Sequence, residues 1–288
     1  MSFSRFDDGG LIDRSRIIGF SFDGKQLEGF AGDTLASALL ANGVSLMGRS
    51  FKYHRPRGLL SGGASEPNAL VTLGDGATRE PNLRASMVAL RDGLVAESQN
   101  RWPSLGFDIG AVNQTLSPFL GAGFYYKTFM WPAALWEKLY EPVIRRAAGL
   151  GRASHAPDAQ EYEKRWAHCD LLVIGSGPAG LMAALSAARA GARVVLCDEN
   201  ADFGGRLIRD RVEIGDADGP GFVAGVVAEL SANPNVRLLS NTTVFGAYDS
   251  GVFGAVERRD GAESGPAQRV WRIVAKRAVL AAGAEERP

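Results

Sequence analysis

The stretch LLVIGSGPAG at residues 171–180 indicates the fold of the C-terminal part of this chain. Its four leading apolar residues are typical of a buried parallel strand. The glycines at 175, 177 and 180 follow the pattern G-x-G-x-x-G, and the small residues after them predict a helix to Ala190. Gly175 permits a tight turn, Gly177 lets backbone N–H groups approach a pyrophosphate, and Gly180 lets the helix pack close to the strand. The stretch therefore predicts a phosphate-binding turn, with the positive end of the helix dipole facing the phosphates.

A second strand completes a βαβ unit around this turn. Gly191 ends the helix, residues 193–197 predict the strand, and Asp198 closes it. A carboxylate at that place can hydrogen-bond the ribose hydroxyls of adenosine, which favours NAD or FAD over NADP. Arg206 leaves a phosphate-bearing ligand open as an alternative.

The rest of the C-terminal part extends this unit to a Rossmann-type α/β domain. The segments FGGR at 203–206 and AAGA at 281–284 resemble motifs of the glutathione-reductase-like flavoproteins, which bind two dinucleotides and place a β-meander between these motifs. The other expected elements are a helix over 221–232, a strand over 236–239, a meander over 243–248, 252–258 and 269–275, and a last buried strand over 278–282. The predicted cofactor-binding residues are Gly175, Ser176, Gly177, Pro178, Ala179, Gly180, Asp198, Glu199, Asn200, Gly205, Arg206, Val244, Ala282 and Gly283.

The N-terminal part predicts a small α+β fold. Asp23-Gly24 is a hairpin turn signal between strands over 16–22 and 25–30. Asp33 or Thr34 caps a helix over 35–41, which Asn42-Gly43 ends. Three short strands are expected later, over 69–73, 85–88 and 93–97. A hairpin, one helix and short strands favour a β-grasp fold.

An aromatic segment lies between the two parts. Residues 101–140 hold ten of the 25 aromatic residues of the chain. Exposing so much apolar surface is costly, so we expect the segment to pack along a domain or subunit surface. A helix is expected over 137–148 and a loose connection over 153–158. The predicted organisation is a β-grasp domain over 1–100, a connector over 101–166 and a Rossmann-type domain with a meander over 167–288.

Composition excludes several classes of protein. Lys plus Arg and Asp plus Glu number 32 each, and this zero net charge disfavours nucleic-acid binding. Two Cys cannot supply the four thiolates of an iron–sulfur cluster, and with three His they disfavour a zinc site. The N-terminus has no apolar signal region, and no apolar stretch approaches the roughly 20 residues of a membrane span, so we expect a cytoplasmic protein. No nucleophilic, paired-carboxylate or metal constellation is present, so we predict neither catalytic residues nor a metal site in this chain.

The segments GRSFKYHRPRG at 48–58, EPNAL at 66–70, GFYYKTFMWP at 123–132, WEKLYEP at 136–142 and IRRAAG at 144–149 carry a more specific signal. Together they resemble the α subunit of heterotetrameric sarcosine oxidase over nearly all 288 residues. The aromatic run at 123–132 is the most discriminating, because many oxidoreductases share the glycine pattern but not this run.

The resemblance implies an activity and a set of partners. In that family the α subunit joins a domain like a [2Fe–2S] ferredoxin to an NAD-binding domain and then to a folate-binding domain. A β subunit carries FAD and oxidises sarcosine to glycine, FMN lies at the α–β interface, and oxygen becomes peroxide. Small γ and δ subunits complete the complex, and the methyl carbon leaves as formaldehyde or as methylene-tetrahydrofolate. For this chain the resemblance therefore implies NAD, with FAD as the alternative occupant.

Two departures from the family pattern shape these expectations. Cluster-bearing relatives have Cys around residues 59–64, where this chain has LSGG at 60–63, so we expect no iron–sulfur cluster and a domain that serves in packing. The chain ends at Pro288, so we expect an incomplete dinucleotide domain and no folate domain here.

Three interpretations stay open. The first is the N-terminal part of a sarcosine oxidase α subunit, and the second is the α component of a two-component opine, proline or glycine dehydrogenase. The third is a non-catalytic scaffold with a vestigial nucleotide site. The basic run at 49–58 is expected to form an interdomain salt-bridge surface or to contact a flavin phosphate, and to bind no nucleic acid.

Overall fold

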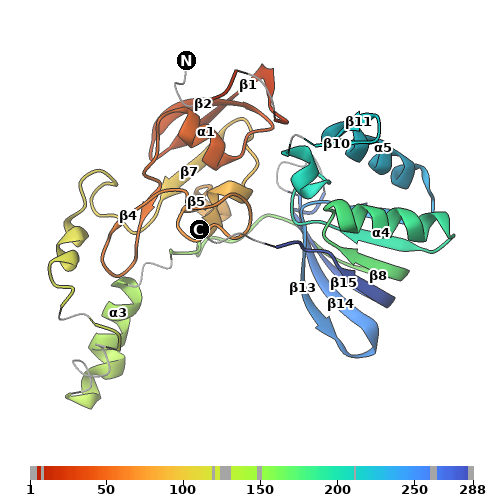
Figure 1. Ribbon diagram of the computed structural model, residues 1–288. Coiled ribbons are helices and arrows are strands. Elements are labelled where there is room, and N and C mark those ends of the chain that lie inside the picture. Colours follow the sequence, from red (N-terminus) through yellow and green to blue (C-terminus); the bar gives the residue numbers. More distant parts are fainter. Residues whose placement is uncertain are drawn as a thin grey trace. The chain divides into compact units, whose positions relative to one another are not determined.

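The chain divides into two units, Met1–Asp158 and Ala159–Pro288, each with its own sheet and core. The computed structural model, drawn in Figure 1, describes residues 5–7, 10–118, 121–123, 131–147, 151–210, 212–259 and 265–284.

A hairpin begins the first unit because its turn sequence supports positive φ angles. β1 (Asp13–Phe22) and β2 (Lys25–Ala31) pair antiparallel, and Asp23 and Gly24 between them have φ of 50° and 79°. The sheet has the strand order β2-β1-β7-β5-β6, in which only β1 and β7 run parallel. The other strands of the unit are β5 (Leu70–Leu73), β6 (Glu80–Arg84), β7 (Leu94–Ser98) and the separate pair β3 (Gly48–Arg49) and β4 (Pro56–Arg57).

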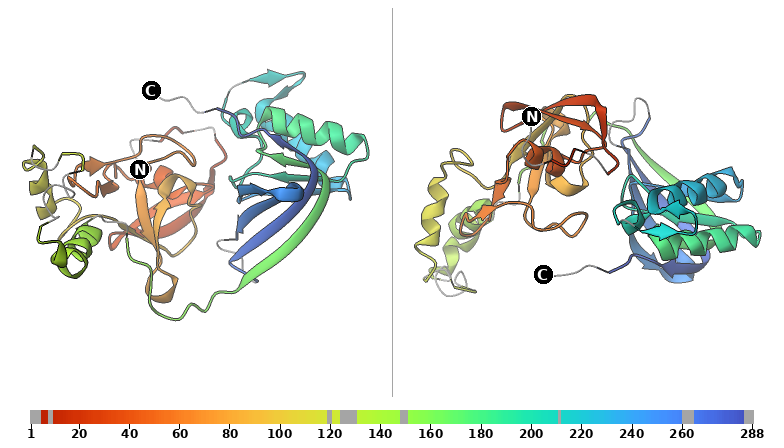
Figure 2. Two further views of the ribbon diagram at one scale, coloured as in Figure 1. Left: turned by 90° about the horizontal axis from the view of Figure 1, so that it is seen from below. Right: turned by 45° about the horizontal axis from the view of Figure 1, so that its top comes forward.

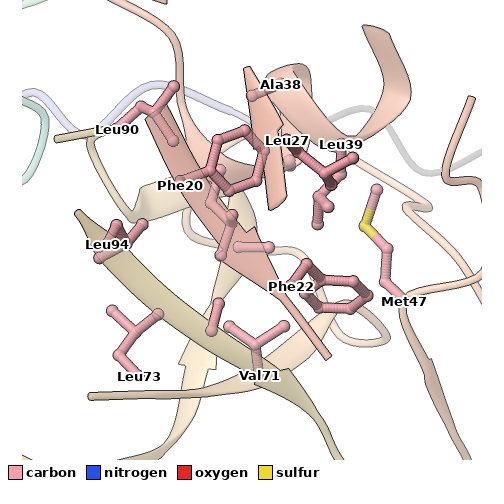
Figure 3. Close-up of a cluster of buried hydrophobic side chains, with 14 of the residues drawn as sticks. Phe20, Phe22, Leu27, Ala38, Leu39, Met47, Val71, Leu73, Leu90 and Leu94 are labelled. Carbon is pink, nitrogen blue, oxygen red and sulfur yellow. The ribbon is translucent and has the colours of Figure 1, made fainter. Parts of the chain in front are cut away.

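One helix covers this sheet. α1 (Leu35–Ala41) begins at Thr34, whose hydroxyl accepts a bond from the Ser37 backbone N–H while the Ser37 hydroxyl accepts one from the Thr34 backbone N–H. Apolar side chains of α1 meet those of β1, and Figure 3 shows Phe20 beside Ala38 and Leu39, and Phe22 beside Met47. A mixed sheet with one packed helix confirms the predicted β-grasp fold.

Three strands of the first unit were not predicted, namely the two-residue strands β3 and β4 and the longer strand β6. β6 contains Pro81, and Asn82 has φ of 65°, so the segment lacks the usual strand signature. β6 pairs only with β5 at the edge of the sheet, where a proline without an N–H is tolerated. The strand predicted over 85–88 is wrong: Ala85–Met87 form the 3-10 helix η2. The strands predicted over 69–73 and 93–97 are confirmed as β5 and β7.

The aromatic segment belongs to the first unit. Its helical elements are η3 (Ile109–Gln114), η4 (Ala133–Leu135), the π-helical turn η5 (Trp136–Tyr140) and α3 (Glu141–Ala147), after the short η1 (Gly76–Thr78) earlier in the chain. The helix predicted over 137–148 is thus α-helical only from Glu141. Trp102, Phe107 and Trp131 are exposed. Half of the aromatic residues that define the segment (Phe119, Phe124, Tyr125, Tyr126 and Phe129) lie outside the described residues.

The second unit is built on a six-stranded sheet of order β12-β9-β8-β15-β14-β13. The first four strands run parallel and the last two continue antiparallel, as the predicted meander requires. Two helices lie along one face (Figure 1). The elements are β8 (Tyr162–Ile174), α4 (Pro178–Arg189), β9 (Val194–Cys197), η6 (Gly205–Ile208), β10 (Glu213–Ile214), β11 (Ala217–Asp218), α5 (Gly219–Ala232), β12 (Val236–Leu239), β13 (Thr242–Tyr248), η7 (Asp249–Gly251), β14 (Val252–Arg258) and β15 (Gln268–Leu280).

A core lies on each face of this sheet. Leu181 and Leu230 of the helices pack against Val173 on one face, and Trp271 and Ile273 belong to the core on the other face. The predicted helix from the glycine pattern to Ala190, the helix over 221–232 and the strand over 236–239 are confirmed as α4, α5 and β12. Together with the β-grasp fold of the first unit, this arrangement confirms the predicted fold class.

The two longest strands differ from the prediction. β8 begins at Tyr162, well before the predicted start of the strand at Leu171. The predicted strands over 269–275 and 278–282 are one continuous strand, β15, which pairs parallel with β8 from Gln268 to Leu280 (Figure 2). The prediction that the last strand is buried is wrong, because Leu280 is 77% exposed. Pairing of β14 ends at Val274, so the second half of β15 has a neighbouring strand on one side only among the described residues.

Candidate dinucleotide site

The glycine loop between β8 and α4 has the backbone that the sequence predicts. Gly175 has φ of 98°, and a Cβ there would lie 2.5 Å from the Ala281 carbonyl oxygen. A Cβ on Gly180 would overlap the carbonyl oxygen of Gly175. A Cβ on Gly177 would meet nothing within 4 Å. Packing therefore requires glycine at 175 and 180, whereas Gly177 borders open space from which a ligand can reach the backbone.

The first turn of α4 is suited to an anion. Gly177 is the N-cap, Pro178 occupies the first turn, and no side chain caps the helix. The backbone N–H groups of Ala179 and Gly180 lie in the first helical turn, where the helix itself offers no acceptor. These donors and the positive end of the helix dipole together favour a phosphate.

Asp198 at the end of β9 is tied to the glycine loop. Its Oδ2 accepts bonds from the Ser176 backbone N–H at 2.7 Å and from the Ser176 hydroxyl at 2.5 Å. Its Oδ1 accepts bonds from the backbone N–H and the side-chain Nδ2 of Asn200, both at 2.9 Å. Only 7% of Asp198 is exposed. Both carboxylate oxygens therefore have two donors inside the protein, and the exposed acid beside them is Glu199.

A second loop packs onto the first. The Gly204 backbone N–H donates to the Ser176 carbonyl at 3.1 Å and to its hydroxyl at 3.2 Å. Gly205 has φ of 54°, and a Cβ on it would lie 3.0 Å from the Cα of Gly177. Arg206 points to Asp210, with Nε 2.9 Å from the carboxylate, and its side chain is mostly exposed. The two glycine segments thus form one cradle, with the Arg206 cation engaged by an acid.

The remaining predicted site residues fall into two groups. Ala282 and Gly283 follow β15, and their neighbour Ala281 donates its N–H to the Ile174 carbonyl at 2.7 Å, directly before the glycine loop. Val244 lies on β13 and packs against the core cluster that contains Ala255 and Trp271. The structure therefore brings 175–180, 198–200, 204–205 and 281–282 to one end of the parallel strands, and places Val244 in a core.

Both cysteine thiols of the chain are expected to be unreactive. Burial raises the pKa of Cys169 to about 11 and that of Cys197 to about 12. A thiol with such a pKa is protonated at neutral pH and is a poor nucleophile and metal ligand. Among the described residues, no group of three or more His, Cys, Asp or Glu side chains could hold a metal ion.

The basic run at 49–58 is partly used within the first unit. Arg49 donates to the Leu105 carbonyl from Nε at 3.0 Å, and His54 Nδ1 lies 2.6 Å from the Asp108 carboxylate. Lys52 and Arg55 lie over the Tyr53 ring. Two residues of the basic run, Arg49 and His54, thus hold the segment around Asp108, whose side chain is fully buried.

A cavity of about 640 Å³ in the first unit does not lie at the glycine loop. Four of its eleven lining residues are arginines, and three of these are paired: Arg79 with Glu97, Arg101 with Asp23, and Arg145 with Glu141. This cavity therefore offers little unbalanced charge to a ligand. No helix in the described part of the chain is long and apolar enough to cross a membrane.

Known families and proteins resemble both units. Residues 15–101 match the family described as "2Fe-2S iron-sulfur cluster binding domain", and residues 170–213 match "FAD dependent oxidoreductase". The chain is 62% identical to "Sarcosine oxidase subunit alpha" of Rhizobium meliloti over 100% of this chain and 30% of that protein. It is 38% identical to "Sarcosine oxidase subunit alpha" of Corynebacterium sp. strain P-1, over 96% of this chain and 25% of that protein.

A solved structure shares the fold of nearly the whole chain. L-proline dehydrogenase from P. horikoshii matches with a TM-score of 0.56 and 22% identity, over 94% of this chain and 41% of that one. The present chain thus spans about a third or less of the length of the curated relatives it matches.

The cluster implied by the first family does not fit the residues present. Residues 15–101 contain no cysteine, and the two cysteines of the chain, Cys169 and Cys197, lie in the second unit. A [2Fe–2S] cluster takes four protein ligands, mostly thiolates. The β-grasp domain therefore keeps the fold of a cluster-binding domain without its ligands.

Proposed function

We propose that this chain, a homologue of the sarcosine oxidase alpha subunit along its whole length, is the N-terminal part of such a subunit. The enzyme would oxidise sarcosine to glycine, with oxygen reduced to peroxide and the methyl carbon released as formaldehyde or passed to tetrahydrofolate. The observation that carries the proposal is 62% identity over an alignment that covers the whole chain, and so includes the aromatic segment that the glycine pattern alone would not require.

The second unit is proposed to hold a dinucleotide, NAD in the first place and FAD as the alternative. The backbone N–H groups of Ala179 and Gly180 would receive the pyrophosphate, which would reach them over the open side of Gly177. Gly205 would border the same phosphates, because it packs against Gly177. When bound, the dinucleotide supplies a redox-active ring that accepts or donates a hydride.

The two neighbouring acids that follow β9 are proposed to have different roles, one structural and one in ligand binding. Asp198 braces the glycine loop through Ser176, because its carboxylate oxygens already have four donors. Glu199 is exposed and is the better candidate for the ribose hydroxyls. Sequence alone pointed first to Asp198 for the ribose, since it stands at the usual position of the acid.

Substrate chemistry is proposed to lie on another chain. No described residue of this chain forms a nucleophilic or acid–base constellation beside the glycine loop. The implied partners are the β, γ and δ subunits, with FMN shared at the interface with the β subunit. Exposed aromatic side chains of the connector, Trp102, Phe107 and Trp131, support a role of this segment in subunit contact.

Co-expression with the neighbouring genes tests the proposal. The full-length protein should copurify with an FAD-containing subunit, and the complex should consume oxygen when sarcosine is added. Oxidation of an opine, proline or glycine in place of sarcosine would support the related two-component dehydrogenases instead. Release of neither NAD nor FAD on denaturation, in a complex that still oxidises sarcosine, would support a vestigial nucleotide site.

A further inference from the structure

The first unit resembles a cluster-binding domain but has no cysteine with which to hold a cluster. The relevant loop, where the family resemblance expects cysteines, runs through residues 59–64 and is followed by Glu66. A loop that has lost its metal ligands needs another way to hold its shape. The structure provides one in the side chain of Glu66.

Glu66 is the most deeply buried acid of the described residues, with 0% of the residue exposed. Its Oε2 accepts bonds from the backbone N–H groups of Leu60 at 2.7 Å and Ser61 at 2.6 Å. Its Oε1 accepts bonds from the backbone N–H groups of Asn68 at 2.6 Å and Ala69 at 3.0 Å. One carboxylate thus joins the start of the loop, at Leu60 and Ser61, to the segment after it, at Asn68 and Ala69, through four main-chain donors.

The electrostatics of this arrangement favour the ionised form. Burial alone raises the pKa of Glu66, but the four N–H donors outweigh burial and hold the pKa below its ordinary value. Hydrogen bonds from backbone N–H groups to a carboxylate are charge-assisted and stronger than neutral ones. A neutral side chain of the same size could not satisfy all four donors.

The loop is also anchored to the core of the β-grasp domain. Ala69 is fully buried, and its carbonyl accepts a bond from the Ala85 N–H at 2.9 Å. The Ser86 hydroxyl donates to the Gly63 carbonyl at 2.7 Å. The Glu66 carboxylate therefore connects the loop to β5 and η2, and its charge bears on the stability of the domain.

We propose that the Glu66 carboxylate is a built-in anion that organises this loop in place of an iron–sulfur cluster. Sulfur atoms of protein-bound clusters commonly accept hydrogen bonds from the protein, and here the loop N–H groups are directed at a carboxylate of the chain itself. The β-grasp domain is then a structural module that binds no cluster and carries no electrons.

Hydrogen exchange on the intact protein tests the carboxylate. In Glu66→Gln the side-chain NH₂ faces two donors, so the amides of Leu60, Ser61, Asn68 and Ala69 should lose protection by about tenfold or more. Glu97→Gln is the matched control, since Glu97 is a half-exposed acid of the same domain paired with Arg79. It should leave those four amides unchanged. Equal protection in Glu66→Gln and the unsubstituted protein would overturn the proposal.

Two measurements on the unsubstituted protein keep the proposal testable if Glu66→Gln does not fold. Protection factors measured from pH 7 down to pH 3 should fall first at these four amides, before those of β1. Iron and sulfide analysis after anaerobic incubation of the full-length chain with ferrous iron and sulfide should find no cluster. A cluster bound stoichiometrically by the β-grasp domain, or simultaneous loss of protection at all amides, would contradict it.

Discussion

The Asp198 carboxylate accepts two bonds from Ser176 through one oxygen, from the backbone N–H at 2.7 Å and from the hydroxyl at 2.5 Å. Asp198 directly follows β9 and Ser176 lies in the glycine loop, and the two residues are 22 positions apart in the sequence. The contact fixes the path of the loop before any ligand arrives. It also keeps the carboxylate of Asp198 out of solvent.

Substitution of Asp198 should therefore affect the protein itself as well as its ligand. Asp198→Asn leaves a donor group facing the Ser176 or Asn200 N–H groups, and we expect a loss of about 1–3 kcal/mol in unfolding free energy. Urea unfolding measures it. Asp202→Asn, an exposed acid of the following loop, should change stability by less than about 0.5 kcal/mol. An unchanged unfolding free energy in Asp198→Asn would show that the hydrogen bonds of Asp198 do not stabilise the glycine loop.

Substitutions of two loop glycines should distinguish a role in ligand binding from a role in folding. Gly177→Ala adds a Cβ with no neighbour within 4 Å and keeps a φ of −62°, so stability should change by less than about 0.5–1 kcal/mol. Because the methyl group occupies the open side of the loop, we expect dinucleotide affinity to fall about tenfold or more. Calorimetric titration with NAD and with FAD measures it. Gly180→Ala should instead lower the unfolding free energy of the second unit, since its Cβ would overlap the Gly175 carbonyl. Equal unfolding free energies for Gly177→Ala and Gly180→Ala would contradict the separate roles of the two glycines.

Glu199 is expected to contribute more to dinucleotide affinity than to stability. Glu199→Gln removes an exposed charge, so it should weaken dinucleotide binding about tenfold or more, as expected for a lost charged hydrogen bond, while stability should change by less than about 0.5 kcal/mol. Arg206→Ala is the matched comparison. The Arg206–Asp210 ion pair is exposed, so its loss should change stability by at most about 0.5 kcal/mol and leave NAD binding intact. Weaker binding in Arg206→Ala than in Glu199→Gln would reverse the two roles.

The stability of the β-grasp domain should depend on pH through Glu66. Its folded-state pKa is lowered, so its stabilising contribution is complete above the ordinary pKa of a glutamate, about 4.3, and is lost as pH falls through the folded-state value. Unfolding experiments at pH 7, 5, 4 and 3 should show a stability gap between the unsubstituted protein and Glu66→Gln that closes at the acid end. A gap that stays constant over this range would exclude the carboxylate charge as its cause.

Neither cysteine should react in the folded protein. Burial places the pKa of Cys169 at about 11 and of Cys197 at about 12, so both thiols are protonated at pH 8. Mass spectrometry after iodoacetamide treatment should find no label in native protein and two labels in urea. Rapid labelling of either thiol under native conditions would contradict their burial in β8 and β9.

The elements that follow local rules were predictable. The Asp23-Gly24 turn, the Thr34 cap of α1 and the glycine loop each depend on neighbouring residues, and all three are found where the sequence places them. β6 and the continuous β15 were missed because their existence depends on pairing with distant strands. Pro81 looks like a strand breaker until the edge position of β6 makes it harmless.

The order of the two folds, the class of ligand suited to the second one and the absence of thiolates from the first can all be read from the order of residues in the chain. The folded chain was needed to show that Asp198 is fully hydrogen-bonded while Glu199 is exposed, and that Glu66 fills the cysteine-free loop. Asp198 and Glu66 differ from other acids because the fold directs backbone and side-chain donors at their carboxylates, whereas a carboxylate in water has the same chemistry at every position of the chain.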